Sequence, residues 1–375
     1  MKKVLKTTPA VFAVGKNYQI IVPVTCETVM WVKVGSKCFY DESNGILRSA
    51  KRIHKMVVPA EILEEVGCYT VCYRRVIKRK AYFSLTHSAE EVAFNFKKVQ
   101  GESIRAYHIA DAHNMIKEPV NCAEKFRKEI GEIDFLILNG DVPEDSDRIK
   151  NFDTIYEIIA QITKGEIPVI FSRGNHDTRG VFAENIAEYT PCENGNSYFT
   201  FRLGNIWGLV LDCGEDKPDT NKEYGNMVAC SFFRENETYF LEKVAQNGEA
   251  QLGDGDIQHK IIVAHNPFTR RYPEPFNIEE DTFTYWARIL KEEIKPQLMI
   301  CGHIHKFSVD MPGCEKDAFG QPCPVVVGSQ VDKRKSYFAG SGFIFKKDNI
   351  EIIFNDEEKI IERHILEKLK EADFC

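Results

Sequence analysis

Residues 168–177 read PVIFSRGNHD, and they join a short apolar run to a cluster of polar side chains. The apolar part, residues 168–171, has the length and composition of a buried strand. Gly174-Asn175-His176-Asp177 follows almost at once. Ligands of open α/β sheets bind at the carboxyl ends of strands, so a strand that leads into Asn, His and Asp predicts a ligand site.

Four further apolar runs lead into clusters of the same kind. The five clusters, in chain order, are Asp111-Ala112-His113, Asn139-Gly140-Asp141, Gly174-Asn175-His176-Asp177, Ala264-His265-Asn266 and Gly302-His303-Ile304-His305. Parallel strands present their carboxyl ends at one edge of a sheet, and we therefore expect all five clusters to converge in space.

The side chains in these clusters suit a pair of divalent metal ions. Imidazole, carboxylate and amide donors fit Mn, Fe, Zn or Co, and no soft thiolate set indicates a structural zinc site. Gly140 and Gly302 precede candidate ligands, where the backbone is expected to turn sharply or to lie close to the ions. Two ions about 3.5–4 Å apart can stabilise both the attacking and the leaving oxygen of a displacement, so hydrolysis of a phosphate ester fits best.

Strands and helices alternate from about residue 96 onwards. Apolar runs predict strands at 104–111, 133–138, 168–171, 198–202, 206–212, 260–264 and 297–301, with further strands to 354. Helices are predicted from a capping box at Asn121 and over about 149–162, 180–189, 235–246 and 283–294. This order indicates an α/β domain with mixed sheets, whereas residues 357–370 fit either a helix or a strand.

Residues 10–95 show a different pattern. Short alternating runs predict strands at 18–24, 28–34, 55–58, 68–73 and 81–85, without a convincing helix between them. Such spacing is typical of a small all-β sandwich, in which Tyr69 is a candidate corner tyrosine. We therefore place an immunoglobulin- or fibronectin-like β-sandwich at residues 1–95 and the α/β domain at residues 96–375.

The five clusters together resemble the motif set of a known family. Asp111-x-His113, Gly140-Asp141, Gly174-Asn175-His176-Asp177, His265 and Gly302-His303-x-His305 occur in the order found in calcineurin-like metallophosphoesterases. The resemblance implies a metallophosphoesterase fold of two packed mixed β-sheets flanked by helices. It also implies an enzyme, a metal-dependent phosphoric ester hydrolase (phosphatase or phosphodiesterase) with two divalent ions as cofactors.

The resemblance implies roles for nine residues. The metal ligands would be Asp111, His113 and His305 at the first ion, Asn175, His265 and His303 at the second, and Asp141 as the bridge between them. His176 would assist attack by a metal-bound hydroxide, either by protonating the leaving oxygen or by stabilising charge. Asp177 would orient the imidazole of His176 and raise its pKa.

A sandwich ahead of such a domain is also the layout of purple acid phosphatases, but the sequence departs from that subfamily. Purple acid phosphatases lack the histidine of the first motif and carry a tyrosine three residues after the bridging aspartate. This chain has His113 and Glu144 at those positions. A ferric-tyrosinate centre is therefore not expected, and we favour a divalent pair such as Mn or Zn.

Composition narrows the class of protein. The 375 residues include 49 Lys or Arg and 56 Asp or Glu, and a net charge of −7 does not suit a basic nucleic-acid binder. The twelve cysteines are diluted over this length, and no apolar run reaches the ~18 residues of a membrane span. We expect reduced cysteines, a cytoplasmic location and no membrane contact; the oligomeric state stays open.

Charge is distributed unevenly along the chain. Residues 1–95 carry 15 basic and 8 acidic side chains, whereas the rest of the chain has a net charge of −14. This asymmetry predicts electrostatic docking between the two parts. Within the basic part, the run Arg74, Arg75, Lys78, Arg79 and Lys80 is typical of a solvated strand edge, or it could contact an acidic partner.

Two alternatives to catalysis on small phosphate esters or phosphoproteins stay open. The fold could serve as a non-catalytic scaffold that binds partners, although His176 and all seven ligand positions are present. The chain could also be a nuclease of the same superfamily, which its acidic α/β domain disfavours. Arg173 and Arg179 flank the central motif, where arginine forks can bind phosphate oxygens or serve as ordinary surface charge.

Overall fold

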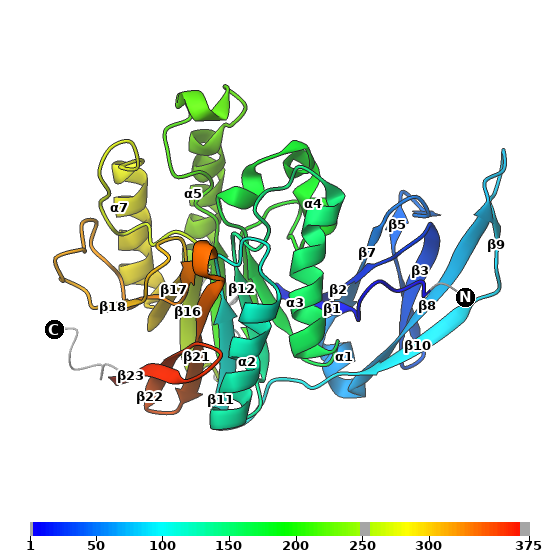
Figure 1. Ribbon diagram of the computed structural model, residues 1–375, viewed down its shortest axis with the longest axis horizontal. Helices are drawn as coiled ribbons and strands as arrows, with labels where there is room; N and C mark the ends of the chain where they lie inside the picture. Colours follow the sequence, from blue (N-terminus) through cyan, green and yellow to red (C-terminus); the bar gives the residue numbers. More distant parts are fainter. Residues whose placement is uncertain (1–2, 248–255, 368–375) are drawn as a thin grey trace.

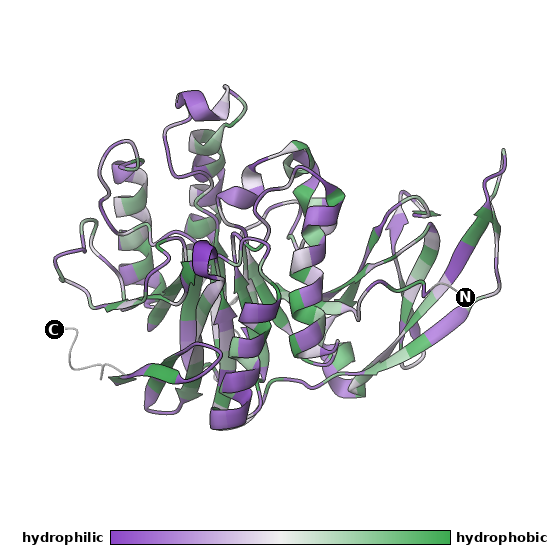
Figure 2. Ribbon diagram, viewed as in Figure 1, coloured by the Kyte–Doolittle hydropathy of each residue, from purple (hydrophilic) through white to green (hydrophobic). Residues whose placement is uncertain are grey.

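The computed structural model describes residues 3–247 and 256–367. Two large β-sheets pack against each other, helices cover their outer faces, and a smaller all-β region lies at one end (Figure 1). This confirms the predicted fold class of two packed mixed sheets flanked by helices. Figure 2 shows hydrophobic residues concentrated in the strands of both sheets and hydrophilic residues along the outer helices.

The first large sheet has ten strands with a parallel centre. The central strands are β11 (Ser103–Ile109), β12 (Phe135–Asn139) and β13 (Val169–Ser172). Beyond β11 lie β21 (Tyr337–Lys346), β22 (Asn349–Asn355), β23 (Ile360–Glu367) and β20 (Gln330–Asp332), and beyond β13 lie β1 (Ala10–Val14), β2 (Asn17–Pro23) and β7 (Ile53–Pro59). Its outer helices are α2 (Lys117–Ile130) and α3 (Asp153–Thr163), the latter preceded by the 3₁₀ turn η1 (Ile149–Phe152).

The second large sheet has six strands. Their order is β14 (Phe199–Leu203), β15 (Ile206–Leu211), β16 (His259–Ala264), β17 (Leu298–Cys301), β19 (Val325–Val327) and β18 (Ser308–Asp310). Its outer face is covered by α5 (Cys230–Gln246) and by α7 (Glu280–Ile289), which continues into η5 (Leu290–Ile294). Ile261 and Val263 pack between the sheets, whereas Ile262 packs with Trp286 of α7. Both faces of β16 are thus buried, which explains its continuous apolar sequence.

The all-β region contains a separate sheet and one short helix. The sheet consists of β10 (Glu90–Asn95), β8 (Cys68–Lys78), β3 (Thr28–Val34) and β4 (Lys37–Tyr40), with β9 (Leu85–Thr86) paired to the end of β8; β5 (Glu42–Ser43) and β6 (Ile46–Leu47) form a small ribbon. The helix α1 (Ala60–Val66) contradicts the prediction that this region lacks helices. It is two turns long and ends at Gly67 in a left-handed conformation, so its apolar repeat is too short to stand out in the sequence.

The all-β region is joined to the α/β region by a shared sheet. β1 lies parallel to β13, with Phe12 opposite Val169, and it carries β2 and β7 into the ten-stranded sheet. The Tyr69 hydroxyl donates to the Gly165 carbonyl at 2.8 Å, so it links the two regions instead of closing a corner within one. A domain boundary between residues 95 and 96 stays a prediction, and the large sheet runs across it.

Ion pairs also cross between the two oppositely charged parts. Lys6 pairs with Asp153, and Lys51 pairs with Glu188. These contacts agree with the expected electrostatic attraction, and β1 also pairs with β13 through its main chain. Within residues 3–247 and 256–367, no helix is both long and apolar enough to cross a bilayer.

Three local predictions are corrected by the structure. Helix α2 begins at Lys117, before the expected capping box, and the Asn121 side chain donates to Glu357 at 2.7 Å. The strand expected at 81–85 is reduced to β9, because residues 81–83 are exposed and lack a partner strand within the described chain. The ambiguous C-terminal segment forms strand β23 as far as Glu367, and residues 368–370 of it lie outside the described chain.

Candidate metal centre

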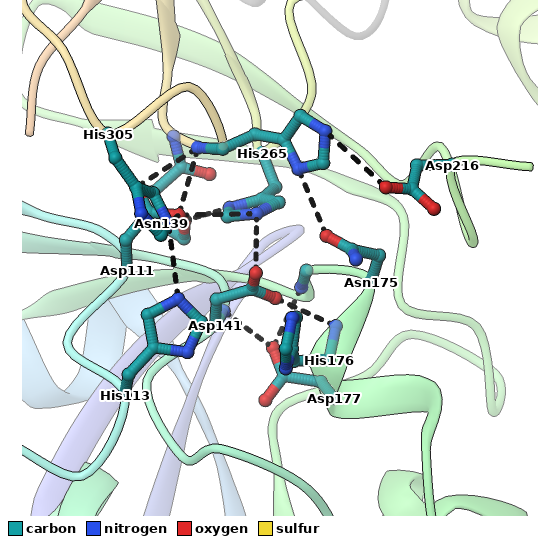
Figure 3. Close-up of polar contacts among 12 residues, drawn as sticks. Asp111, His113, Asn139, Asp141, Asn175, His176, Asp177, Asp216, His265 and His305 are labelled. Atoms are coloured by element: carbon teal, nitrogen blue, oxygen red, sulfur yellow. Dashed lines mark hydrogen bonds and ion pairs between the residues drawn. The ribbon is translucent and has the colours of Figure 1, made fainter. Parts of the chain in front are cut away.

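The five clusters predicted to converge do meet, at the carboxyl ends of strands from both large sheets (Figure 3). The contributing strands are β11, β12 and β13 of the first sheet and β16 and β17 of the second. Each side chain comes from the first few residues after its strand, where the backbone leaves the sheet. The parallel course of these strands therefore brings together residues that lie up to 194 positions apart, Asp111 and His305 among them.

Most of these side chains sit on backbone in the left-handed region. Asp111, His113, Asp141, His303 and His305 have φ between 45° and 69°. Non-glycine residues adopt such values rarely, and they do so mainly where the surrounding structure enforces them at functional sites. Five of the seven predicted ligands share this conformation, which marks the cluster as a built site.

The first candidate ion site contains Asp111, His113 and His305, whose ligand atoms lie within 4.8 Å of one another. His113 Nε2 faces His305 Nε2 at 3.2 Å, and His305 Nε2 is 3.3 Å from Asp111 Oδ1. The Asp111 carboxylate is held by the backbone N–H of His303 at 3.0 Å and by the Ser329 hydroxyl at 2.5 Å. These three residues are the set predicted for the first ion, and their role as ligands stays a prediction.

The second candidate ion site contains Asp141, His265 and His303, again within 4.8 Å. His265 Nε2 lies 3.2 Å from Asp141 Oδ2 and 3.7 Å from Asp111 Oδ1. Its Nδ1 donates to the Asn139 carbonyl at 2.7 Å, and this bond turns Nε2 toward the carboxylates. Asp141 also groups with His113 of the first site and with His176, so it neighbours both sites, and its role as a bridge stays a prediction.

The amide of Asn175 completes the second group. Its side-chain oxygen is 3.1 Å from His303 Nδ1 and 3.3 Å from Asp141 Oδ2. Two oxygens at this distance repel each other unless a hydrogen or a cation lies between them. Rotating the amide by 180° would replace the repulsion by hydrogen bonds and bring the oxygen 3.1 Å from Arg179, whereas a cation would make the present orientation favourable.

Charge in the cluster is set by burial and by close carboxylate–imidazole pairs. Burial opposes the negative charge of Asp111, but neighbouring imidazoles outweigh it and hold the pKa of Asp111 at about 2. Asp141 is likewise buried, and His265 lowers its pKa. Burial lowers the pKa of His113 and His303 to about 4, so both rings are neutral near pH 7. Although burial also acts on His265, Asp141 raises the pKa of that ring to about 10.

Two anionic carboxylates and the neutral imidazoles of His113 and His303 form a donor set that fits divalent cations. The buried Nε2 of His265 makes no hydrogen bond in the described chain, and it points into the space between Asp111 and Asp141. His113 Nε2 and His305 Nε2 also face each other, and at most one of the two nitrogens can donate a hydrogen bond to the other. The second nitrogen keeps a lone pair that a cation could accept. Nitrogen and oxygen donors of this kind suit Mn, Fe, Zn or Co.

Glycines allow the clusters to approach this closely. A Cβ added to Gly140 would lie 2.5 Å from His265 Nδ1, and one added to Gly174 would lie 2.3 Å from Asp141 Oδ1. At Gly302 a Cβ would lie 2.8 Å from Asp111 Oδ2. The expectation that Gly140 and Gly302 lie against the candidate ligands agrees with this geometry.

His176 lies beside the cluster, but Asp177 does not orient its ring. The His176 Nδ1 donates to the Glu144 carbonyl at 2.8 Å, and the backbone N–H of His176 donates to Asp141 Oδ1 at 2.8 Å. The buried Asp177 carboxylate accepts instead from the backbone N–H groups of Gly174 and Asp141, at 2.8 and 3.1 Å. The predicted Asp177–His176 contact is therefore wrong: Asp177 holds together the two loops that carry Asn175 and Asp141.

Arg179 forms the open side of the cluster next to His176. Its Nη1 lies 3.2 Å from His176 Nε2, and its Nε and Nη2 donate to the two oxygens of Glu215 at 2.8 and 2.9 Å. Glu215 is fully buried, and it also accepts from the Thr178 hydroxyl at 3.0 Å. The hydrogen bonds to Glu215 raise the pKa of Arg179, so the guanidinium is a fixed positive charge beside the imidazole.

Several residues near the centre were given no role there from the sequence. Glu144 Oε2 lies 3.2 Å from His113 Nδ1, and Asp216 Oδ2 lies 3.8 Å from His303 Nε2. Asn139, directly after β12, supplies the carbonyl that orients His265. Its place within the Asn139-Gly140-Asp141 cluster was the available signal, whereas Asp216 and Ser329 reach the site through loops that no motif marks.

Arg173, a candidate for phosphate binding, is engaged elsewhere. Its Nε lies 2.6 Å from Asp212 Oδ2, and its guanidinium stacks over Phe233 at 5.0 Å. Arg270 is similarly paired with Asp310. His54 and His259 are both buried, and His54 Nδ1 lies 2.6 Å from Asp41. Arg179 is therefore the arginine that the structure places next to the candidate centre.

Comparison with protein families gives one match to the region that contains the centre. The family model for calcineurin-like phosphoesterases matches residues 104–307, which is more than half of the 375 residues. These residues include all seven predicted ligands and His176. Among curated proteins no sequence matches the chain.

Solved structures share the fold at low sequence identity. Purple acid phosphatase PPD1 from yellow lupin (Lupinus luteus) seeds is similar with a TM-score of 0.59 and 11% identity, over 96% of this chain and 74% of the lupin chain. GAP50 from Plasmodium has a TM-score of 0.45 and 14% identity, over 72% and 90%. Vacuolar protein sorting 29 from Cryptosporidium parvum has a TM-score of 0.38 and 10% identity, over 72% and 100%. Because the lupin match covers 96% of the chain, it takes in most of the N-terminal all-β region as well.

Proposed function

Because the chain belongs to the calcineurin-like phosphoesterase family, we propose that it is a metal-dependent hydrolase of phosphate mono- or diesters with two divalent ions as cofactors. The observation that carries this proposal is a third group of candidate ligands, His113, Asp141 and His176, which shares His113 with the first group and Asp141 with the second. Two groups of donors linked in this way are what a pair of ions held a few ångströms apart requires.

The proposed ligands follow the two groups. Asp111, His113 and His305 would hold one ion, Asn175, His265 and His303 would hold the other, and Asp141 would bridge them. When bound, the ions would supply a nucleophile at neutral pH and neutralise charge on the phosphate. The nitrogen and oxygen donors support Mn, Zn, Fe or Co, and Glu144 in place of a tyrosine supports a colourless protein.

His176 is the residue we propose to handle the leaving group. Because its Nδ1 donates to a carbonyl, that nitrogen keeps its hydrogen and the ring presents Nε2 to the open side of the site. The side chain is 23% exposed, compared with 1% for His265 and 2% for His113. A proton carried by Nε2 can be donated from this position to the leaving oxygen of a bound ester.

Arg179 is the residue we propose to bind the phosphate. Its Nη1 already lies 3.2 Å from His176 Nε2, so a phosphate oxygen that enters between them would contact both. The bidentate bond to Glu215 fixes the plane of the guanidinium and leaves Nη1 directed at the site. The proposed substrate is accordingly a phosphorylated small molecule or a phosphoprotein.

Activity and metal content test this proposal together. The purified protein, loaded with Mn, Zn, Co or Fe(II) in turn, should hydrolyse p-nitrophenyl phosphate, bis-p-nitrophenyl phosphate or both, and elemental analysis should find two ions per chain. His176→Ala should keep the ions and lose about 100-fold or more of the rate, because it removes only the proton donor. Asp141→Asn should lose both metal and rate.

Other outcomes would point away from catalysis. A protein that binds metal but hydrolyses neither ester, with His176→Ala behaving like the wild type, would favour a non-catalytic binding scaffold. A visible charge-transfer band in the purified protein would contradict the divalent pair. Preference for single-stranded DNA or RNA over both small esters would indicate a nuclease instead.

A further inference from the structure

The hairpin formed by β8 and β9 extends beyond the body of the all-β sheet. Residues 68–75 of β8 pair with β3 or β10, whereas Val76 and Lys78 pair with the short strand β9, and the Val76 N–H also donates to the Glu27 carbonyl at 2.9 Å. Figure 1 shows this hairpin projecting at the end of the molecule farthest from α7. The connecting residues therefore form a convex tip (residues 77–83).

Every residue of this tip is exposed. Tyr82 and Phe83 are 94% and 87% exposed, and Ile77 and Leu85 on the two strands are 50% and 46% exposed. Single exposed apolar residues are ordinary, but two adjacent aromatic side chains at a protruding end are not. The alternating pattern of residues 81–85 predicts a strand, and a strand pattern gives no reason to expect both aromatic rings in solvent.

The same tip carries unpaired positive charge. Residues 66–89 contain five Lys or Arg and no Asp or Glu. Arg79 pairs with Glu27 at 3.1 Å, but Arg74, Lys78 and Lys80 form no ion pair within residues 3–247 and 256–367. The net charge of +7 on residues 1–95, against −14 on the rest, would turn this end of the molecule toward an anionic surface.

We propose that the tip binds an anionic lipid surface, with Tyr82 and Phe83 entering the interface and Lys78 and Lys80 contacting lipid headgroups. Aromatic rings flanked by Lys and Arg are the combination that binds peripheral proteins to such surfaces. A convex tip of seven residues lacks the groove along which a nucleic-acid strand would lie, and it is smaller than the about 20–30 residues a side of a standard protein–protein interface. This inference replaces the expectation of no membrane contact, and it is independent of the proposed hydrolase activity.

Vesicle co-sedimentation of the full chain tests the proposal. The protein should sediment with vesicles of phosphatidylcholine and phosphatidylglycerol and remain in solution with phosphatidylcholine alone. Lys78→Gln/Lys80→Gln should lower the partition coefficient about tenfold or more at low salt, because each basic side chain contributes to the attraction. Tyr82→Ser/Phe83→Ser should lower it at low and at high salt, since salt does not screen apolar contact.

Matched variants and a spectroscopic readout complete the test. Lys128→Gln/Lys150→Gln makes the same charge change on the α/β region, and Phe232→Ser removes a ring that is 65% exposed on α5; both should bind like the wild type. In Phe83→Trp, the fluorescence of the added tryptophan should shift to shorter wavelength only when anionic vesicles are present. All variants should keep the wild-type circular dichroism spectrum, because the substituted side chains are exposed.

Three results would overturn the proposal. They are absence of wild-type binding to anionic vesicles, equal binding of the tip variants and the matched controls, and binding to polyglutamate or to a single-stranded oligonucleotide in place of vesicles. The last result would assign the tip to an acidic protein or to a nucleic acid. Hydrolysis of p-nitrophenyl phosphate should be unchanged in Tyr82→Ser/Phe83→Ser, so failure of this inference and failure of the proposed hydrolase function are separate observations.

Discussion

Replacement of Arg179 by alanine should weaken both stability and catalysis, for different reasons. The stability effect comes from Glu215, whose buried carboxylate accepts two hydrogen bonds from the guanidinium and one from Thr178. Removing one partner of a buried ion pair leaves the other charge uncompensated, which typically costs about 3–5 kcal/mol. We expect a loss of that size in urea unfolding of Arg179→Ala.

The catalytic effect comes from Nη1, which lies 3.2 Å from His176 Nε2 at the open side of the cluster. If this group binds a phosphate oxygen in the transition state, its removal should lower kcat/KM by about 10²–10³-fold, as for other preorganised donors. Arg179→Lys should recover little of the rate, because an ammonium group cannot bind both Glu215 oxygens and direct a further N–H at the site.

A double variant separates these two effects. Arg179→Ala/Glu215→Gln removes the uncompensated charge and should recover most of the lost stability, whereas kcat/KM should stay at the level of Arg179→Ala. Rates with p-nitrophenyl phosphate and urea unfolding measure the two quantities on the same preparations. Recovery of activity together with stability would refute the assigned role, because Arg179 would then act only by holding the fold together.

Three further predictions follow from single contacts. Gly174→Ala would place a methyl group 2.3 Å from Asp141 Oδ1, so elemental analysis should find less than the full metal content, and full occupancy would contradict the proposed bridge. Tyr69→Phe removes the hydroxyl that donates to the buried Gly165 carbonyl and should cost about 1–3 kcal/mol in urea unfolding, whereas an unchanged midpoint would mean that water replaces the bond. Burial and Asp212 raise the pKa of Glu237, so the folded protein keeps a proton that the unfolded chain releases above its ordinary pKa of 4.5. The contribution of Glu237 to stability is therefore present at low pH and lost as pH rises, and Glu237→Gln should lose less stability than the wild type between about pH 5 and about pH 8.

The ligand positions were predictable because their signal is local. Each cluster follows a short apolar run, and a strand that is buried on both faces has an unmistakable sequence. His265 illustrates the point, since residues 259–264 are apolar apart from His259 and Lys260 and lead directly into the ligand. Parallel pairing then brings the strand ends together without further information from the loops.

The partners of those ligands were not predictable because they are set by loop conformation. Asp177 is adjacent to His176 in sequence, yet the 3₁₀ turn η2 (His176–Thr178) turns its carboxylate toward backbone N–H groups and leaves the Glu144 carbonyl to hold the imidazole. Glu215 likewise lies 36 residues from Arg179. No periodicity in the sequence relates such pairs.

The shared position of β1 explains why the domain division was hard to derive from the sequence. Residues 10–14 are buried on both faces, as in a central strand, because β1 completes the sheet next to β13. The alternating pattern that predicted a sandwich is clear in β3, whose residues are alternately buried and partly exposed. The N-terminal region thus contains strands of two kinds. Strands such as β1 belong to the shared ten-stranded sheet, whereas strands such as β3 form a separate sheet.

The layout of the centre makes its two candidate ion sites interdependent. Asp141 and His113 also form a group with His176 that links the two sites, and five of the seven predicted ligands adopt left-handed backbone, which costs about 1–3 kcal/mol per residue where it is strained. The packed sheets must hold these residues in place. Asp111 and Asp141 follow the neighbouring parallel strands β11 and β12, and their loops are joined by a hydrogen bond from the Asp111 N–H to the Gly140 carbonyl at 3.0 Å. A displacement of β12 would therefore move Asp141 relative to both ions at once. Substitutions that loosen the packing of β12 should for this reason weaken both ions together, whereas substitution of His305, which belongs to one group, should weaken a single ion.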